Sequence, residues 1–237
     1  MSFNKLYIVV GASSGLGHEF AKHVSIKNKT IGIYNKTKRA GNQNIIYLKV
    51  NIEYKQQIEK FFKEKKSFIN KFKVITFINF ATYKKDDLIL NIKDKDIKKT
   101  FSINLFSNIF FIQNLIKNFY LKKLNIIFIS SSLGKNVDAG TLLYSSSKIS
   151  LESLMKSIVI EYSEFNVRCN TLVLGFFKSP LWNRLNDAKK DKITKLLPSK
   201  KIGKVSNILN TIKFIEKNED INSSLIYLDS GFRSVKI

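Results

Sequence analysis

Cysteine, proline and histidine are scarce in this sequence. It holds one cysteine, Cys169, two prolines and two histidines among 237 residues. A single cysteine cannot form an internal disulfide, which excludes a disulfide-stabilised secreted scaffold and indicates a reducing, cytoplasmic compartment. Both histidines, His18 and His23, fall in the first predicted helix, so no partner base is marked for a catalytic thiol at Cys169.

Long apolar runs are also lacking. No window approaches the roughly 18 apolar residues that a membrane-spanning helix needs. The first apolar run, 6–10, is short and leads directly into glycines rather than into a signal-peptide cleavage site. We therefore expect a protein without a membrane segment.

Arginine is rare although the chain is strongly basic. The formal net charge is +23, yet only four of the 41 basic residues are arginine. Arginine is the residue that contacts phosphates and base edges in bidentate geometry, so its scarcity argues against a nucleic-acid partner. Lysines scattered among asparagine, isoleucine and phenylalanine are typical of a solvated surface with a compositional bias. An acidic partner is the alternative interpretation.

Short apolar runs alternate with segments of helical periodicity along the whole chain, with no repeat or proline-rich linker. The predicted strands are 6–10, 30–34, 45–50, 74–79, 126–130, 167–174 and 225–229. The predicted helices are 15–24, 53–66, 96–119, 144–165, 181–197 and 205–217. This alternation predicts an α/β fold in one domain over 1–237. We expect a Rossmann-type, doubly wound parallel sheet of about seven strands with helices on both faces.

In such a sheet the ligand lies at the carboxyl ends of the strands, so the residues after each strand are candidate site residues. Glycines let the backbone approach a pyrophosphate, and the next helix directs its N-terminus at that anion. The first strand is followed by a glycine-rich loop of Gly11, Ser13, Ser14, Gly15, Leu16 and Gly17. Its spacing differs from G-x-G-x-x-G, and a tight turn without function is the alternative interpretation.

The residues after the next three strands suit other parts of a dinucleotide. None of those after the second strand is acidic, and Lys36 lies among them. An acid there usually binds the ribose of NAD, whereas a base suits the 2′-phosphate, so we expect NADP(H) rather than NAD(H). One more surface lysine is the alternative. Asn51 and Ile52 are placed to border an adenine ring, and Asn79 and Ala81 to let the backbone lie close to the cofactor.

The fifth strand ends in serines, and Tyr144 comes 13 residues after Ser131, followed by Lys148. Tyrosine and lysine at i and i+4 share one helix face. A lysine ammonium beside a phenol favours the phenolate, which moves the tyrosine pKa down toward the range of an acid–base catalyst. A Y-x-x-x-K pair alone is common and usually marks an exposed helix face, so its position after a serine-bearing strand is what indicates chemistry.

Together these residues resemble the short-chain dehydrogenase/reductase family over nearly the whole chain. Asn104, Ser131, Tyr144 and Lys148 match the family's catalytic tetrad in order and spacing. The segment 174–179 resembles its nicotinamide-contacting P-G-x-x-x-T, and 229–231 resembles its C-terminal D-G-G. Gly175 and Ser179 occupy the glycine and threonine positions of the first pattern, and the resemblance makes Gly175, Phe177 and Ser179 candidate cofactor contacts. The chain departs from the family's N-N-A-G over 79–82 at Phe80 and Thr82, from P-G-x-x-x-T at Leu174 and from D-G-G at Ser230.

The resemblance implies an oxidoreductase that interconverts a carbonyl and a secondary alcohol with a nicotinamide cofactor. Tyr144 would give its proton to the substrate oxygen, and Ser131 would hold that oxygen. Lys148 would bind the nicotinamide ribose and favour the ionised tyrosine, while Asn104 would anchor a water that connects Lys148 to solvent. The family also implies a substrate lid near 181–198 and a homodimer or homotetramer.

The substrate stays open at this point. The stretch 87–92 and the helix leading to Asn104 resemble the 3-oxoacyl-acyl-carrier-protein reductase branch. That branch implies an acyl-thioester substrate and an acidic acyl carrier protein as partner, with Lys122 and Lys123 as candidate contacts. A sugar or other polar small molecule is the alternative within the enzyme class. A nucleotide sensor without turnover and a nucleic-acid binder are the alternatives outside it, and the complete tetrad argues against the sensor.

Overall fold

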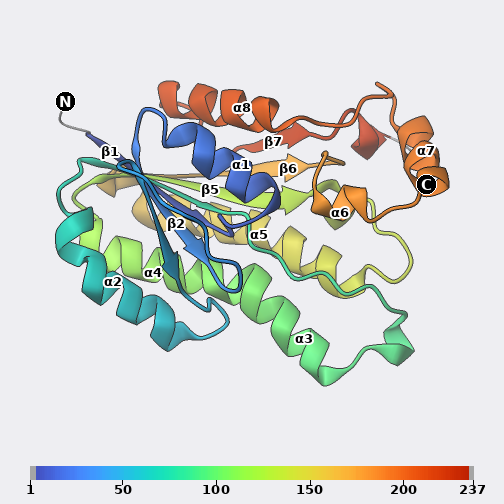
Figure 1. Ribbon diagram of the computed structural model, residues 1–237, viewed down its shortest axis with the longest axis horizontal. Coiled ribbons are helices and arrows are strands. Elements are labelled where there is room, and N and C mark those ends of the chain that lie inside the picture. Colours follow the sequence, from blue (N-terminus) through green and yellow to red (C-terminus); the bar gives the residue numbers. More distant parts are fainter. Residues whose placement is uncertain (1–3, 235–237) are drawn as a thin grey trace.

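The computed structural model, which describes residues 4–234, has a seven-stranded parallel sheet at its centre (Figure 1). Neighbouring strands follow the order β3-β2-β1-β4-β5-β6-β7. The strands are β1 (Lys5–Val10), β2 (Lys29–Tyr34), β3 (Ile45–Lys49), β4 (Val74–Asn79), β5 (Lys123–Ser131), β6 (Val167–Leu174) and β7 (Leu225–Leu228). This confirms the predicted doubly wound fold. The terminal residues 1–3 and 235–237 of the domain expected over 1–237 lie outside the described part.

Helices cover both faces of the sheet, with α1 and α8 on one face and α2, α4 and α5 on the other (Figure 1). The α-helices are α1 (Gly15–Val24), α2 (Lys55–Ile69), α3 (Asp94–Phe101), α4 (Ser107–Phe119), α5 (Leu142–Tyr162), α6 (Pro180–Asn183), α7 (Asp187–Leu196) and α8 (Val205–Lys217). No helix within residues 4–234 is long and apolar enough to cross a lipid bilayer.

Alternating side chains of each strand supply two separate cores. In β1, Leu6, Ile8 and Val10 pack in the core under α2, α4 and α5. Tyr7 and Val9 of the same strand pack in the core under α1 and α8. A strand that is buried on both faces reads as a continuous apolar run, which is why these strands are recognisable from the sequence.

Two predicted helices are interrupted in the structure. The helix expected over 96–119 is divided into α3 and α4 by a π-helical turn, Ser102–Phe106, with Asn104 at its centre. The helix expected over 181–197 is divided into α6 and α7 because the Asn186 side chain starts a new helix, accepting a hydrogen bond from Lys189 N at 2.8 Å. The side chains of residues 180 and 181 lie outside the described part.

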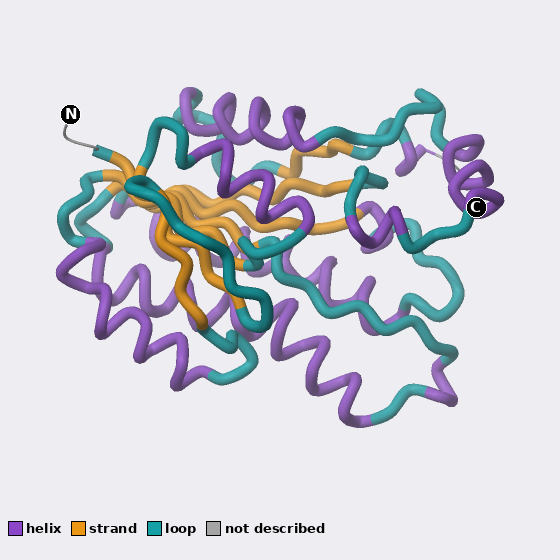
Figure 2. The backbone as a smooth tube through the Cα atoms, viewed as in Figure 1, coloured by secondary structure: helices purple, strands orange, loops and turns teal. Residues whose placement is uncertain are grey.

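The carboxyl ends of β5 and β6 lie on the right in Figure 1, on the same side as α6 and α7. The long loop that leads from β4 to α3 runs along this edge of the molecule (Figure 2). The fold therefore brings the loops after several strands to one end of the sheet, as expected for a doubly wound fold.

A buried carboxylate at Glu216 joins α8 to the sheet. It accepts hydrogen bonds from Tyr7 Oη at 2.8 Å and Thr76 Oγ1 at 2.7 Å, and it pairs with Lys5. The Glu216 side chain is only 9% exposed. Removing it would leave a partly buried ammonium and two hydroxyl groups without their acceptor, which costs more than the loss of an exposed ion pair.

We expect Glu216→Ala to lower the free energy of unfolding by about 2–4 kcal/mol, as measured by urea denaturation. Glu219→Ala is the matched control, because Glu219 pairs with Lys123 but its side chain is 71% exposed. The control should change stability much less, because an exposed ion pair is screened by solvent. Equal effects of the two variants would contradict a structural role for the Glu216 cluster.

Candidate active site

The glycine-rich loop follows β1 at the point where the strand order reverses, between β1 and β4. Gly11 has a φ of +75°, and a Cβ atom there would lie 2.7 Å from Ala81 N. A Cβ atom on Gly17 would lie 2.4 Å from Gly11 O. The loops after β1 and β4 therefore approach each other so closely that only backbone fits between them.

The start of α1 fits an anion such as a dinucleotide pyrophosphate. Its first turn contains no acidic residue, and the N-cap Ser14 makes no side-chain capping bond. The amide groups of this turn are therefore available to a ligand, and the helix dipole favours negative charge there. Gly15, with a φ of +57°, directs the chain into the helix.

Three basic residues, Lys36, Lys38 and Arg39, follow β2. Lys36, which the sequence singled out for the 2′-phosphate, is exposed. The sequence did not single out Arg39 for this role, yet Arg39 Nε donates a hydrogen bond to Ser13 O at 2.9 Å. The structure thus attaches a guanidinium to the glycine-rich loop. The basic stretch after β2 was a signal for it, but the choice between its members depended on the fold.

The residues after β3 are only partly free for a cofactor. Asn51 Oδ1 accepts a hydrogen bond from Glu53 N at 3.2 Å, and Asn51 N donates to Gln57 Oε1 at 2.7 Å. Ile52 is 6% exposed and packs in the core under α2. Both residues lie at the edge of the sheet where the sequence placed them, but Ile52 presents little side-chain surface.

Asn79 connects the loop after β4 to α4. Its Nδ2 donates hydrogen bonds to Asn108 Oδ1 at 3.2 Å and to Ser107 Oγ at 3.4 Å. Its Oδ1 accepts from Ala81 N at 2.9 Å. Asn79 therefore fixes the backbone at Ala81, which is the backbone that meets Gly11.

Asn104 makes four side-chain hydrogen bonds within the chain. Its Nδ2 donates to Tyr83 O and to Ser147 Oγ, both at 2.9 Å. Its Oδ1 accepts from Tyr83 N at 2.8 Å and from Thr82 Oγ1 at 3.2 Å. An amide has two donors and two acceptor sites, so this side chain, 1% exposed, has none left for the expected water. A water could bind only the Asn104 backbone carbonyl, which already accepts from Asn108 Nδ2 at 2.9 Å.

Tyr144 and Lys148 lie one turn apart on α5, and Lys148 is buried. Lys148 Nζ donates to Ile129 O at 2.9 Å and lies 5.8 Å from the centroid of the Tyr144 ring. Burial lowers the pKa of Lys148 to about 8. The two side chains therefore lie close together, as the i, i+4 spacing predicts. The lysine is packed against the backbone of β5 rather than exposed to solvent.

The pKa of Tyr144 is raised, which corrects the expectation that Lys148 would lower it. Burial is the largest cause, because it disfavours the phenolate. A hydrogen bond with Ser131 opposes this effect, and the negative charge of Asp86 adds to it. The tetrad geometry thus includes Ser131 next to the phenol, at the end of β5.

The loop after β6 completes this edge of the sheet. A Cβ atom on Gly175 would lie 2.7 Å from Asp229 Cα, so the loop packs tightly against the turn after β7. Phe177 is buried and forms a β-bridge with Gly203, which leaves mainly its backbone for a ligand. Ser179 Oγ caps α6 by accepting from Trp182 N at 3.3 Å.

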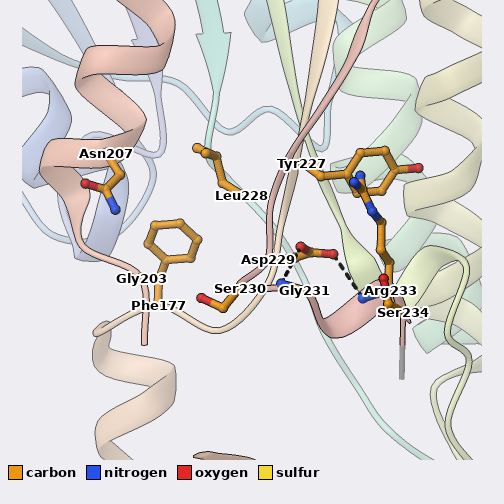
Figure 3. Close-up of a pocket in the computed structure, with 10 residues that line it drawn as sticks. All are labelled: Phe177, Gly203, Asn207, Tyr227, Leu228, Asp229, Ser230, Gly231, Arg233 and Ser234. Carbon is orange, nitrogen blue, oxygen red and sulfur yellow. Dashed lines mark hydrogen bonds between the residues drawn. The ribbon is translucent and has the colours of Figure 1, made fainter. Parts of the chain in front are cut away.

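The turn after β7 borders a cavity of about 390 Å³, shown with its lining residues in Figure 3. The Asp229 carboxylate accepts hydrogen bonds from Gly231 N at 3.0 Å and Arg233 N at 3.1 Å, which fixes this turn. Phe177 and Gly203 line the same cavity. None of the tetrad residues lines it, so it lies beside the candidate active site rather than in it.

A family model described as short chain dehydrogenase matches residues 5–190 of this chain. The chain belongs to the short-chain dehydrogenase family. It is therefore an oxidoreductase, and members of the family work with a nicotinamide cofactor. The predicted family and enzyme class are confirmed.

Relatives of this short-chain dehydrogenase resemble it over nearly their full length. It is 24% identical to "Carbonyl reductase family member 4" of Xenopus laevis, covering 97% of this chain and 98% of that protein. It is 27% identical to a 3-oxoacyl-acyl-carrier-protein reductase of Buchnera aphidicola, covering 96% of each. The fold matches Thermoplasma acidophilum aldohexose dehydrogenase with a TM-score of 0.87 at 20% identity, over 99% of this chain and 96% of that one. It also matches 4-hydroxyisoleucine dehydrogenase complexed with NADH, with a TM-score of 0.87 at 21% identity, over 98% and 100%.

Two charged residues beside the tetrad were missed from the sequence. In this short-chain dehydrogenase, Lys84 Nζ lies 5.5 Å from the centroid of the Tyr144 ring and 3.0 Å from Asp86 Oδ2. Both residues belong to the loop after β4. Nothing local distinguishes them in a chain with 41 basic residues. Cys169, by contrast, is fully buried and burial raises its pKa, so its thiol is not placed to act as a nucleophile.

Asp86→Asn should lower the pKa of Tyr144, because it removes a negative charge that disfavours the phenolate. The measurement is an ultraviolet absorbance titration of phenolate, from which the curve of Tyr144→Phe is subtracted. Asp87→Asn is the control, since Asp87 lies next in the chain but uses its carboxylate on Leu88 N at 3.0 Å. A Tyr144 titration that is identical in Asp86→Asn and the parent would contradict this electrostatic coupling.

Proposed function

We propose that this short-chain dehydrogenase interconverts a ketone and a secondary alcohol with NADP(H), using Tyr144 as the proton donor in the reductive direction. The observation that carries the proposal is the juxtaposition of the Tyr144 phenol, the Ser131 hydroxyl and the buried Lys148 ammonium. These three groups lie at the carboxyl end of β5. The strand order reverses nearby, between β1 and β4, where the glycine-rich loop can hold a dinucleotide.

The chain's own residues act on the substrate oxygen. The cofactor would supply or accept the hydride. Tyr144 gives its Oη proton to the carbonyl oxygen, and its raised pKa keeps the phenol protonated until that oxygen becomes basic. Ser131 Oγ accepts from Leu133 N at 3.3 Å, and its hydroxyl forms a hydrogen bond with the Tyr144 phenol. We assign the Ser131 hydroxyl hydrogen to the developing negative charge on the oxygen of the bound substrate.

Lys148 stabilises the ionised form of Tyr144. With a pKa of about 8 it is mostly protonated near neutral pH, so it favours the phenolate that forms when Tyr144 has given up its proton. We assign it the further task of binding the nicotinamide ribose. Asn104 acts as a positioning residue, because its bond to Ser147 Oγ holds the turn of α5 between Tyr144 and Lys148.

The cofactor contacts follow the order of the strands. We assign the pyrophosphate to the loop after β1, the adenine to the loop after β3, and the nicotinamide to the loops after β4 and β6. The proposed cofactor residues are Gly11, Ser13, Ser14, Gly15, Leu16, Gly17, Lys36, Asn51, Ile52, Asn79, Ala81, Tyr144, Lys148, Gly175, Phe177 and Ser179. The segment 181–198, which includes α7, is the proposed substrate lid.

Preference for NADP(H) is supported by the three cations after β2 and by the absence of an acid there. Arg39 is the best placed of the three because its hydrogen bond to Ser13 O holds it against the glycine-rich loop. Its planar guanidinium suits a phosphate group in bidentate geometry. We therefore add Arg39 to Lys36 as a candidate contact of the 2′-phosphate.

Two substrate classes are supported by different observations. A 3-oxoacyl thioester is supported by several full-length relatives that carry that reductase name at 24–27% identity. Lys122 and Lys123 add little to an acyl-carrier partner, because Lys122 Nζ donates to Phe72 O at 2.7 Å and Lys123 pairs with Glu219. A polar small molecule is supported by the charged pair of Lys84 and Asp86 beside Tyr144.

We also propose that the enzyme is a homodimer or a homotetramer. Large apolar side chains are exposed at the ends of α4 and α5, where a second copy would cover them. Tyr120 is 44% exposed, Ile160 is 83% exposed and Phe165 is 46% exposed.

Tyr144→Phe should lower kcat by about 10²–10⁴-fold, because it removes the proton donor without changing the shape of the ring. Cofactor affinity, measured by fluorescence titration with NADPH, should stay within a few-fold. Tyr162→Phe is the matched control, with the same chemical change at the far end of α5. Full activity in Tyr144→Phe would rule out the proposed proton donor.

Arg39→Ala and Lys36→Ala should each weaken NADPH far more than NADH, by about tenfold or more for Arg39. The dissociation constants of both cofactors are measured for each variant. Lys27→Ala is the control, because Lys27 is exposed at the amino end of β2, away from the proposed site. An equal loss for the two cofactors would mean that the 2′-phosphate site is elsewhere.

A further inference from the structure

Hydrogen bonds hold the loop after β4 in place at two points beside α5. Asn104 bonds both the N–H and the carbonyl of Tyr83, at 2.8 and 2.9 Å. Asp87 N donates to Gly140 O at 2.9 Å, just before α5 begins. The three residues between these points, 84–86, are therefore held next to the helix that carries Tyr144, and their placement is not that of an unrestrained surface loop.

Lys84 is the cation that this segment presents to the site. Its Nζ lies 5.5 Å from the centroid of the Tyr144 ring, within the range of a cation–π contact. Its side chain is 29% exposed, compared with 74% for Lys60 and 75% for Lys195. The Lys84 side chain is thus partly shielded from water, and it lies beside Tyr144, the residue that we propose protonates the substrate.

The pair of Lys84 and Asp86 does not hold the loop in place. Exposed ion pairs contribute little to stability, and the loop is already held by the backbone bonds at Tyr83 and Asp87. An ammonium has three donors, and Asp86 is the only hydrogen-bonding or ion-pair partner of Lys84 that we find among residues 4–234. Asp86, with a side chain 49% exposed, can therefore turn to solvent and be replaced by another anion.

We propose that Lys84 binds an anionic group of the substrate, so that the preferred substrate is a short oxo acid whose carboxylate lies near the reacting ketone. This inference rests on the proposed function and names its substrate class. In the reduction, the ketone carbon gains hydride with two electrons from NADPH, which becomes NADP⁺, and the oxygen gains the Tyr144 proton. The carboxylate is unchanged and serves only for binding.

Substrate binding would itself strengthen the attraction between Lys84 and the substrate carboxylate. When a ligand displaces water from around Tyr144, the effective dielectric falls and the attraction between Lys84 and the carboxylate increases. A neutral 3-oxoacyl thioester gains nothing from Lys84 and instead must desolvate the ion pair. The charge at Lys84 therefore discriminates between the two substrate classes.

The test compares kcat/KM for acetoacetate with that for two neutral probes, ethyl acetoacetate and the N-acetylcysteamine thioester of acetoacetate. The parent enzyme should prefer acetoacetate. Lys84→Met should lower the ratio of acetoacetate to ethyl acetoacetate by about tenfold or more, mainly through KM. Asp86→Asn should raise that ratio, because it removes the competing carboxylate.

Lys85→Met is the matched control. Lys85 is the next residue of the same loop, but it lines a separate cavity of about 700 Å³ together with lysines of α3. It should leave the ratio unchanged. Equal kcat/KM for charged and neutral probes in the parent, with no change in Lys84→Met, would overturn the inference while leaving the proposed function intact.

A second measurement is independent of turnover. In the presence of NADPH, acetoacetate should raise the melting temperature of the parent more than ethyl acetoacetate does, and Lys84→Met should abolish that difference. If no probe is reduced with either cofactor, that result counts against the proposed function. The thermal shift then decides the role of Lys84 alone, and an equal shift in the parent and Lys84→Met would overturn it.

Discussion

The buried side-chain amide of Asn104 uses both donors and both acceptor sites on the protein itself. It holds the loop after β4 on one side and Ser147 of α5 on the other, and it lies in a π-helical turn that sets it between them. A buried amide that lost these partners would carry a large desolvation cost, so the arrangement is strongly specified. The path of the loop, and with it the distance of Lys84 from Tyr144, depends on these bonds.

Burial, rather than a neighbouring charge, dominates the electrostatics of this site. It raises the pKa of Tyr144 and lowers that of Lys148 to about 8, so each group shifts toward its neutral form. A protonated phenol suits a group that must give a proton to a carbonyl oxygen. A hydrogen bond and a charge have smaller effects: the Ser131 hydroxyl favours the phenolate and the Asp86 carboxylate disfavours it.

The strong positive charge of the chain bears on function only where a lysine or arginine is held at the candidate site. Most of the lysines are exposed, as expected for a solvated surface. Arg39 and Lys84 differ because each contacts a part of the candidate site, Arg39 at Ser13 O and Lys84 at Asp86 beside the Tyr144 ring. One faces the proposed cofactor phosphate and the other the proposed substrate, which together suit an enzyme whose two ligands are both anionic.

The sequence by itself determined the seven strands, the glycine-rich loop after β1, and the pairing of Tyr144 with Lys148, because apolar periodicity and i, i+4 spacing are local properties. Only the tertiary structure decided that Asn104 lies in a π-helical turn, that Arg39 rather than Lys36 contacts the loop, and that Lys84 and Asp86 border Tyr144. The direction of the Tyr144 pKa also needed the fold. Each of these depends on burial or on residues tens of positions apart, and packing alone brings such residues together.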